Sequence, residues 1–255
     1  MTRTPELCAM ILAAGEGTRL RPITDTIPKA MVEVGGRPLI DYALDTVRRA
    51  GLSEVVINLH YLGSIIRDYI GDGSRHGLRV LFSEEDPLLD SGGGIVHARE
   101  FLGDRTFVTL NADTIIDADL TEIVESHRAS RATATMVLRK DPKMAEFGLI
   151  RIDSGGRIRR FLDHAAPGAP AAEELDAYMF SGVQVLEPTV FDYMPAEGAF
   201  SITRVTYPAM LAAEEPLHGF RFDGQWITVG TPEELADANV TLASKLDSRE
   251  DTTVS

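Results

Sequence analysis

The sequence predicts an α/β fold: a Rossmann-like three-layer sandwich on a mainly parallel mixed sheet, with a smaller β-rich lobe. Over about residues 1–130, short apolar segments alternate with segments of helical periodicity. From residue 132 onward, strand-like segments joined by short turns prevail. The 255 residues, 44% of them hydrophobic, can build one large domain. We expect that single domain over residues 1–245, with a second half over about 131–245, and a disordered polar tail over 246–255.

In the first half, strands and helices are expected to alternate. The apolar run over 7–14 is too short for a helix and ends at glycine, which indicates a buried strand. The helix expected over 38–50 carries Leu39 and Val47 on one apolar face, and Gly51 ends it. The same criteria give strands at 54–58, 78–82 and 106–110, and helices at 63–70, 95–101 and 120–129.

In the second half, strands dominate. The helix expected over 232–243 has Thr231 as a plausible N-cap and Pro232 in its first turn. The other elements are strands at 132–139, 149–152, 157–161, 178–186, 217–222 and 226–229, and short helices at 188–193 and 203–213.

Three unusual loops follow predicted strands, at residues 14–29, 84–94 and 111–113. Right-handed crossovers place the loops after parallel strands on one edge of the sheet. Ligands of such sheets bind at the carboxyl ends of the strands. We therefore expect the three loops to form one binding site.

The charge of the chain limits the class of ligand. The formal net charge is −14 and the pI is about 4.8, which disfavours a nucleic-acid backbone or an anionic membrane as the main partner. The single cysteine, Cys8, lies in the first predicted strand and cannot form an intrachain disulfide. No apolar run approaches the length of a membrane span, and the N-terminus lacks a secretory signal pattern. The expectation is a soluble, cytoplasmic protein.

The loop after the first strand combines glycine with positive charge. Gly15 and Gly17 let backbone N–H groups approach a ligand closely, and such groups form a concavity for anions. Arg19, Arg21 and Lys29 follow within a few residues. Neither the dinucleotide fingerprint nor the P-loop pattern fits this segment. The combination predicts a phosphate site of another kind.

Two further segments carry groups suited to a nucleotide. Asp113 follows a buried strand and is either a turn or helix-cap acid or a Mg²⁺ ligand, of which the phosphate loop favours the second. The segment Ser91-Gly-Gly-Gly94 precedes a predicted helix, so its backbone donors are expected to be free for an anion or a base edge. Flexible-loop glycine is the alternative for this segment.

The string Gly15-Glu-Gly-Thr-Arg-Leu-Arg-Pro22, followed by Pro28-Lys29, resembles the signature loop of the sugar-1-phosphate nucleotidyltransferases. The segment Trp226-Ile-Thr-Val-Gly-Thr-Pro-Glu233 is similar to a second motif of that family. The segment Phe200-Ser-Ile-Thr-Arg204 with Tyr207-Pro208 is similar to the mannose-1-phosphate and heptose-1-phosphate guanylyltransferases. The resemblance covers about residues 8–239, and the absence of a hexapeptide β-helix repeat matches the short members.

The resemblance implies condensation of a nucleoside triphosphate with a sugar 1-phosphate, releasing pyrophosphate, with Mg²⁺ as cofactor, in a monomer or homodimer. It makes the second half the sugar-binding one and assigns catalysis to Arg19, Lys29 and Asp113, with Asp113 on the metal. It assigns nucleotide binding to Leu12, Ala13, Ala14, Gly15, Gly17, Thr18, Glu85, Ser91, Gly92 and Gly93, and the sugar phosphate to Asn111, Glu146, Gly148 and Gly182.

Two departures from the family pattern weaken the metal and anion site. The family's second metal-binding aspartate corresponds to Thr228, a neutral and poorer Mg²⁺ ligand, for which Asp223 is a conceivable substitute. The family's sugar-phosphate lysine falls near Asp163-His164, and histidine is mostly neutral at pH 7.

Three alternatives therefore stay open from the sequence. The acidic segment 84–90 slightly favours GTP, because a carboxylate can accept from guanine N1–H and N2–H₂ together, but a UTP- or CTP-using enzyme also fits. One CTP-using possibility is cytidylyl transfer to an alcohol phosphate. A catalytically weak homologue that binds a nucleotide sugar or a partner protein is the alternative from another class.

Overall fold

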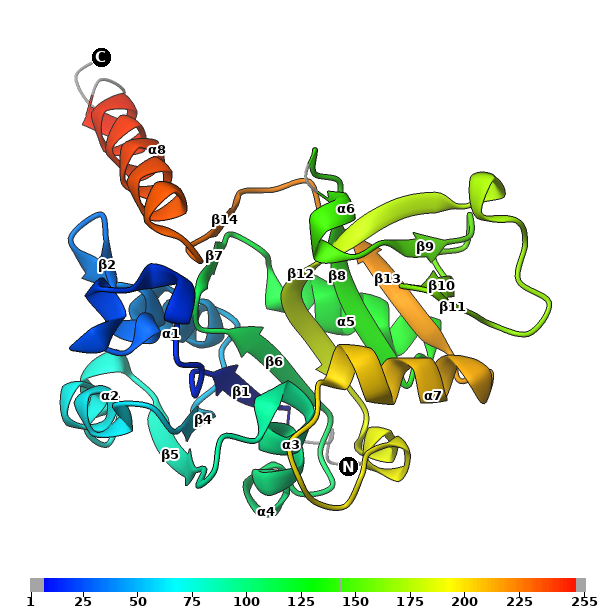
Figure 1. The fold of residues 1–255 in the computed structure, drawn as a ribbon, viewed down its shortest axis with the longest axis horizontal. Helices are drawn as coiled ribbons and strands as arrows, with labels where there is room; N and C mark the ends of the chain where they lie inside the picture. Colours follow the sequence, from blue (N-terminus) through cyan, green and yellow to red (C-terminus); the bar gives the residue numbers. More distant parts are fainter. Residues whose placement is uncertain (1–6, 143, 251–255) are drawn as a thin grey trace.

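The computed structural model describes residues 7–142 and 144–250 of the chain. The predicted α/β class is confirmed: a mixed sheet, mostly parallel at its centre, carries helices on both faces (Figure 1). The strands are β1 Cys8–Leu12, β2 Glu33–Val34, β3 Arg37–Pro38, β4 Glu54–Leu59, β5 Arg79–Glu84, β6 Phe107–Asn111, β7 Thr114–Ile116, β8 Ala134–Arg139, β9 Ile150–Ile152, β10 Ile158–Phe161, β11 His164–Ala165, β12 Asp176–Leu186, β13 Leu217–Arg221 and β14 Trp226–Thr228.

The α-helices are α1 Leu39–Arg49, α2 Gly63–Ile70, α3 Asp90–His97, α4 Arg99–Leu102, α5 Leu120–Ser130, α6 Met144–Phe147, α7 Tyr207–Ala212 and α8 Pro232–Glu250. Most of them overlap the predicted ranges, but α6 was not predicted, and the helix expected over 95–101 is two helices, α3 and α4, of which the first begins at Asp90. Short 3₁₀ and π turns connect the helices, among them η1 Thr18–Leu20, η3 Lys29–Met31 and η7 Ile202–Thr206. Helix α8 continues to Glu250, and residues 251–255 of the tail expected over 246–255 lie outside the described part.

The centre of the sheet is parallel, in the order β6-β1-β4-β5. Strand β12 joins β6 in antiparallel sense and extends into the second half, where β8 and β13 lie beyond one of its edges. Strands β9, β10 and β11 continue the sheet from the N-terminal part of β12. This mixed extension is the β-rich lobe, on the right of Figure 1.

Strand β1 shows why the molecule has three layers. Its successive side chains point to opposite faces. Ala9 and Ile11 pack into the core under α1, α2 and α5, whereas Cys8 and Met10 pack into the core under α3, α4 and α7. A strand that is buried on both faces reads as a continuous apolar run, which is the pattern that predicted it.

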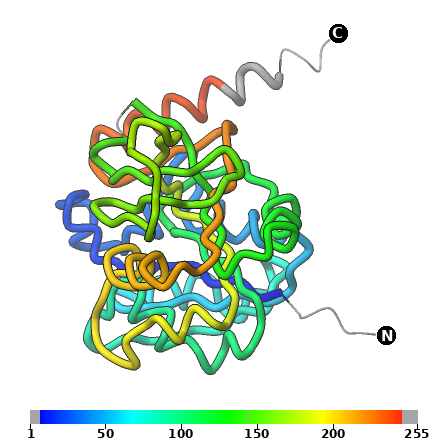
Figure 2. The backbone as a smooth tube through the Cα atoms, turned by 90° about the vertical axis from the view of Figure 1, so that its right-hand side faces the viewer, coloured from blue at the N-terminus to red at the C-terminus, as the bar shows by residue number. Residues whose placement is uncertain are grey.

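A third, smaller core joins the two ends of the chain. Leu20, Val32 and Leu39 from the N-terminal segment pack with Val229 and Ala238 from the C-terminal segment. Helix α8, in orange and red, runs at the edge of the body rather than over the sheet (Figures 1 and 2). Helix α8 therefore supports the segment that follows β1.

The strand β7 was not predicted, and it forms a separate two-stranded ribbon with β14. In this ribbon Thr228 is opposite Thr114, and the Val229 N–H donates to the Asp113 carbonyl over 3.1 Å. The ribbon thus brings the 226–229 segment beside the end of β6. No helix in the described part of the chain combines the length and apolar content needed to span a bilayer.

Candidate active site

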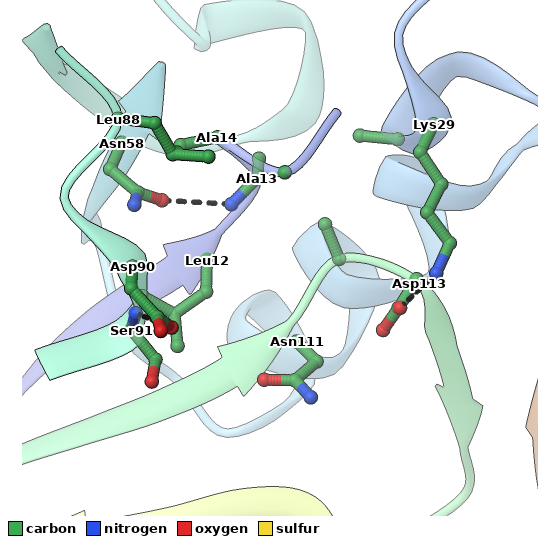
Figure 3. Close-up of a pocket in the computed structure, with 13 residues that line it drawn as sticks. Leu12, Ala13, Ala14, Lys29, Asn58, Leu88, Asp90, Ser91, Asn111 and Asp113 are labelled. Carbon is green, nitrogen blue, oxygen red and sulfur yellow. Dashed lines mark hydrogen bonds and ion pairs between the residues drawn. The ribbon is translucent and has the colours of Figure 1, made fainter. Parts of the chain in front are cut away.

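The carboxyl ends of β1, β4 and β6 meet in register. Leu12 is paired with Asn58 of β4 on one side and with Asn111 of β6 on the other. The ends of these strands open into a cavity of about 450 Å³ (Figure 3). The cavity is lined by Leu12, Ala13, Ala14, Gly15, Lys29, Ala30, Asn58, Leu88, Asp90, Ser91, Asn111, Ala112 and Asp113.

The three loops expected to converge do so. The 14–29 loop contributes Gly15 and Lys29, the 84–94 segment contributes Asp90 and Ser91, and the loop after β6 contributes Asp113. In Figure 3, Lys29 and Asp113 lie at one side of the cavity, and Asp90 and Ser91 lie at the other.

Lys29 and Asp113 form an ion pair at one side of the cavity (Figure 3). The Lys29 ammonium contacts Oδ2 of Asp113, and both side chains are partly shielded from solvent. Oδ1 of Asp113 also accepts the Thr114 hydroxyl over 3.3 Å. Since the ammonium charge is already matched by a carboxylate, the cavity has little spare positive charge of its own.

The glycine loop positions these groups in two ways. A Cβ on Gly15 would meet nothing within 4 Å, and this residue lines the cavity directly. Gly17 has φ +65°, and a Cβ there would lie 2.9 Å from the Cβ of Lys29. Gly17 therefore allows the close approach that sets the lysine in place.

Arg19 and Thr18 lie in η1 and are exposed outside the cavity wall. The Arg19 guanidinium approaches the β14–α8 connection, where a Cβ on Gly230 would lie 2.7 Å from its Nη2. Among the side chains that the structure describes, in residues 7–142 and 144–244, this guanidinium has no hydrogen bond or ion pair. Its donors are available to a ligand at the rim.

Glu85 has a different position from the one expected of a base-reading acid. It is 4% exposed, its Oε1 accepts from Asn58 over 2.7 Å, and its Oε2 accepts from the Leu89 N–H over 2.9 Å. Asn58 in turn accepts the Ala13 N–H over 2.8 Å, as drawn in Figure 3. Glu85 thus holds the wall of the cavity together instead of facing the cavity.

The triple glycine lies within helix α3, not before it, because the helix begins at Asp90. The expectation of free backbone donors is wrong for Gly92 and Gly93, whose N–H groups donate to the Phe200 carbonyl over 2.8 and 3.2 Å. A Cβ on Gly92 would lie 2.2 Å from the Phe200 ring, and one on Gly93 would lie 2.4 Å from the Gly198 carbonyl oxygen. These glycines allow close packing of α3 on the 198–202 segment.

The residues predicted for the sugar side are only partly brought together. Asn111 lines the main cavity. Gly182, with φ +91°, leaves room for the Asn111 side chain, because a Cβ on Gly182 would lie 2.9 Å from Nδ2 of Asn111. Gly148 lines a separate cavity in the β-rich lobe, and Glu146 is exposed on α6. The structure does not join these two with Asn111 in a single wall.

Five residues of the wall are absent from the predicted site residues: Ala30, Asn58, Leu88, Asp90 and Ala112. Asn58 is the next-to-last residue of β4 and the last residue of the strand predicted at 54–58, so the rule that singled out Asp113 would have found it. Leu88 and Asp90 belong to the acidic segment, but their orientation depends on how the loop folds. Asp90 has φ +59°, and its Oδ1 accepts the Ser91 N–H over 2.5 Å.

The fit to a metal ion rests on a single carboxylate. Within the described residues, no three His, Cys, Asp or Glu side chains are placed to hold a metal together. Thr228 lies beside Asp113 along the ribbon but lines a neighbouring hollow of about 290 Å³. Asp223 is not placed to replace Thr228. The Asp117 N–H donates to the Gln225 carbonyl, and Asp117 is four residues, or about 13 Å along a strand, from Asp113. Asp223 precedes Gln225 by two residues, at the end of the ribbon that is remote from Asp113.

The glycine loop and the strand-end acid lie at the carboxyl edge of the parallel strands, which is where α/β proteins of this architecture bind their ligands. The family model of the nucleotidyl transferases matches residues 8–245. The chain belongs to this family, and the resemblance to sugar-1-phosphate nucleotidyltransferases is confirmed.

Its relatives use different nucleotides. The chain is 34% identical to a UTP–glucose-1-phosphate uridylyltransferase of Synechocystis, over 87% of this chain and 60% of the relative. It is 30% identical to a mannose-1-phosphate guanylyltransferase of Mycobacterium tuberculosis, over 94% of this chain and 65% of the relative. It is 33% identical to an N-acetylmuramate α-1-phosphate uridylyltransferase of Neisseria meningitidis, over 90% of this chain and 96% of the relative.

The chain therefore spans less than two thirds of the first two relatives and nearly all of the third. Among solved structures, a UDP-glucose pyrophosphorylase from Acinetobacter baumanii superposes with a TM-score of 0.75 at 19% identity, over 91% of this chain and 92% of that chain. At this identity the superposition supports the fold.

Proposed function

We propose that the protein condenses a nucleoside triphosphate with a sugar 1-phosphate and releases pyrophosphate. The observation that carries the proposal is the cavity in which the glycine loop, the α3 segment and the Lys29–Asp113 pair converge at three strand ends. The family match over residues 8–245 and the three named relatives support the same reaction class.

The residues act by positioning and by charge. A phosphate oxygen of the sugar 1-phosphate attacks the α-phosphorus in line, and the bond to the pyrophosphate oxygen breaks. Because the nucleophile is already an anion, no protein base is needed. Lys29 contacts the phosphates from the cavity wall, and Arg19 donates to the leaving pyrophosphate from the rim as charge develops there. Gly15 offers its backbone N–H to the phosphates.

We propose Mg²⁺ as the cofactor, held by Asp113, by the substrate phosphates and by water. The ion would neutralise phosphate charge and orient the reacting groups. The support is electrostatic: Lys29 is already paired with Asp113, and Asp90 adds a second negative charge to the wall. A triphosphate there needs positive charge beyond what Lys29 supplies.

We propose GTP as the nucleotide. Of the acids in the 84–90 segment, Asp90 lines the cavity, whereas both oxygens of Glu85 are engaged within the protein. One Asp90 oxygen accepts from Ser91, which leaves the other for a base. A carboxylate suits the two adjacent donors of guanine better than the single N–H of uracil. The competing proposal is UTP, which two of the three named relatives use.

One assay tests these proposals together. Pyrophosphate release is measured with GTP, UTP, CTP, ATP and dTTP against glucose, mannose and N-acetylmuramate 1-phosphates, and with phosphocholine as a non-sugar acceptor. Release with a sugar 1-phosphate is expected, with GTP preferred. Asp90→Asn keeps the backbone conformation, since asparagine tolerates positive φ, and should reduce the preference for GTP over UTP. A wild type that prefers UTP refutes the assignment of the base.

A silent homologue is the second candidate, and the single carboxylate at the metal site favours it. It predicts nucleotide binding by calorimetry without pyrophosphate release for any pair. Release above the level of a Lys29→Met variant excludes it.

A further inference from the structure

Thr24 is a fully buried polar residue of the segment that follows the glycine loop. It lies in the 3₁₀ turn η2 (Ile23–Asp25) and is 0% exposed. Its hydroxyl donates to the Gly17 carbonyl over 2.8 Å, and the Leu20 N–H donates to the same carbonyl over 2.9 Å. Because a buried hydroxyl without a partner costs free energy, this bond favours the loop conformation in which the Gly17 carbonyl faces Thr24.

The side chains of Thr24 and Lys29 both pack against Gly17. A Cβ on Gly17 would lie 2.9 Å from the Cβ of Lys29 and 3.0 Å from Cγ2 of Thr24. These two side chains therefore fill the space that a side chain at residue 17 would take. Since protein interiors are close-packed, a shift of the Gly17 backbone moves the base of the Lys29 side chain with it.

The packing at its base decides where the Lys29 side chain ends. A lysine ammonium is carried by a flexible stem of carbon atoms, so its position depends on how that stem is held. Here the side chain is 15% exposed, lines the main cavity, and contacts Oδ2 of Asp113 with its ammonium (Figure 3). The Thr24 hydroxyl thus acts on the Lys29 ammonium through Gly17.

Other contacts of the same turn hold it less firmly. Arg21 and Asp25 form an ion pair over 3.3 Å, but both side chains are more than half exposed. Exposed ion pairs contribute little to stability. The Tyr61 hydroxyl reaches the Asp25 carbonyl only over 3.5 Å, which is long for a hydrogen bond. The buried bond from Thr24 is the tie that connects this turn to the glycine loop.

We propose that Thr24 is a positioning residue: its hydroxyl fixes Gly17, and through Gly17 it holds the Lys29 ammonium where the triphosphate binds. This inference rests on the proposed function, because that function brings the phosphates to Lys29. Thr24 itself is fully buried and is not among the described residues that line the main cavity.

Four variants test the assignment. Thr24→Val removes the hydroxyl and keeps the shape, Thr24→Ala removes it without placing a methyl group against the carbonyl, and Thr24→Ser retains it. Thr46→Val is the matched control, because Thr46 is 3% exposed and its hydroxyl also donates to a backbone carbonyl, that of Tyr42, over 2.9 Å. Thr46 lies in α1, outside the main cavity.

The first measurement is pyrophosphate release with the best substrate pair. Thr24→Val and Thr24→Ala should lower kcat/KM for the triphosphate by about 10- to 100-fold, the range for a group displaced by up to about 1 Å. The KM for the sugar 1-phosphate should change by less than about twofold. Thr24→Ser and Thr46→Val should stay close to the wild type. Unchanged kcat/KM in Thr24→Val overturns the proposal, and so does an equal loss in Thr46→Val.

The second measurement asks whether Thr24 acts through Lys29. Calorimetric titration with GTP and UTP in the presence of Mg²⁺ compares wild type, Thr24→Val, Lys29→Met and the double variant. Thr24→Val should weaken triphosphate binding by about tenfold or more in the wild type, but by less than about twofold when Lys29 is already replaced. A residue that only supports the fold would cause equal losses in both backgrounds, and equal losses overturn the proposal.

The titration also distinguishes failure of this inference from failure of the proposed function. If the wild type releases no pyrophosphate with any pair, the proposed function fails, and binding of GTP and UTP still decides on Thr24. Binding that is weakened in Thr24→Val and retained in Thr46→Val supports the assignment. Equal binding by the three proteins, or no binding by the wild type, overturns it.

Discussion

Restoring a carboxylate at residue 228 tests the metal site directly. In the β7–β14 ribbon Thr228 is opposite Thr114, and Val229 donates to the Asp113 carbonyl over 3.1 Å. Neighbouring strands lie about 4.8 Å apart. Thr228→Asp therefore places a second carboxylate near any ion held by Asp113, with Val229 still anchored in the buried core.

The size of the effect follows from charge. A divalent ion and a carboxylate about 4 Å apart attract by about 2 kcal/mol at the dielectric of water. Repulsion between two carboxylates about 5 Å apart offsets about 0.8 kcal/mol of this attraction. The remainder, about 1.2 kcal/mol, corresponds to a five- to tenfold lower Mg²⁺ concentration at half-maximal rate.

The assay is a Mg²⁺ titration of pyrophosphate release at saturating substrates. Thr228→Asn is the matched control, because it has nearly the size of aspartate and no charge. Thr228→Asp should shift the midpoint to lower Mg²⁺, and Thr228→Asn should not. Coincident curves for wild type and Thr228→Asp, or equal shifts for both variants, refute the idea that the site lacks a carboxylate at this position.

Three more predictions concern the loop, the packing and pH. Arg19→Ala should lower kcat by about 10²–10³ while the melting temperature stays constant, because the exposed guanidinium is assigned to the developing charge; near-normal kcat contradicts the assignment. Gly92→Ala forces a Cβ to 2.2 Å from an aromatic ring. Overpacking at the upper end of its usual range, about 2–3 kcal/mol, exceeds the gain in helix propensity of about 1 kcal/mol, so Tm should fall by about 2–8 °C. Gly15→Ala, with nothing within 4 Å of its Cβ, should leave Tm unchanged. Burial lowers the pKa of His127 below 6.5, although its hydrogen bond to Glu187 acts in the opposite direction. Below pH 6.5 the unfolded chain therefore binds a proton at His127 more readily than the folded protein does. The free energy of unfolding should decrease as the pH falls below that value. When the free energy of unfolding is measured by chemical denaturation between about pH 5 and 8, its dependence on pH should be weaker for His127→Gln than for the wild type. Equal pH dependence in the two proteins would contradict this assignment.

The elements that carry the site could be predicted because their signals are local. A buried apolar run such as Val55–Ile57 is predicted as a strand regardless of how its neighbouring residues are assigned. Parallel strands bring their carboxyl ends together whatever their side chains are. That rule alone placed Gly15, Lys29 and Asp113 around one cavity, as the structure has them.

The parts that escaped prediction depend on contacts between distant segments. The sequence shows that Glu85 is an acid in an acidic loop, but not that Asn58 would occupy one of its oxygens across 27 positions of the chain. Likewise, nothing near Gly92 indicates that the Phe200 ring will take the space of a side chain. The strand β7 escaped because three residues after a turn acid are too few for a period to be recognised.

The small core shared by the two ends of the chain has a consequence for biosynthesis. Leu20 lies in the loop that follows β1 and Val32 comes soon after that loop, whereas their packing partners Val229 and Ala238 follow about 200 positions later. At the usual rate of translation, that interval lasts roughly 10–40 s. During this time the emerging polypeptide carries its glycine loop without the part of this core that Val229 and Ala238 supply. The packing around the first part of the candidate site to leave the ribosome is therefore completed only when the C-terminal segment has been made.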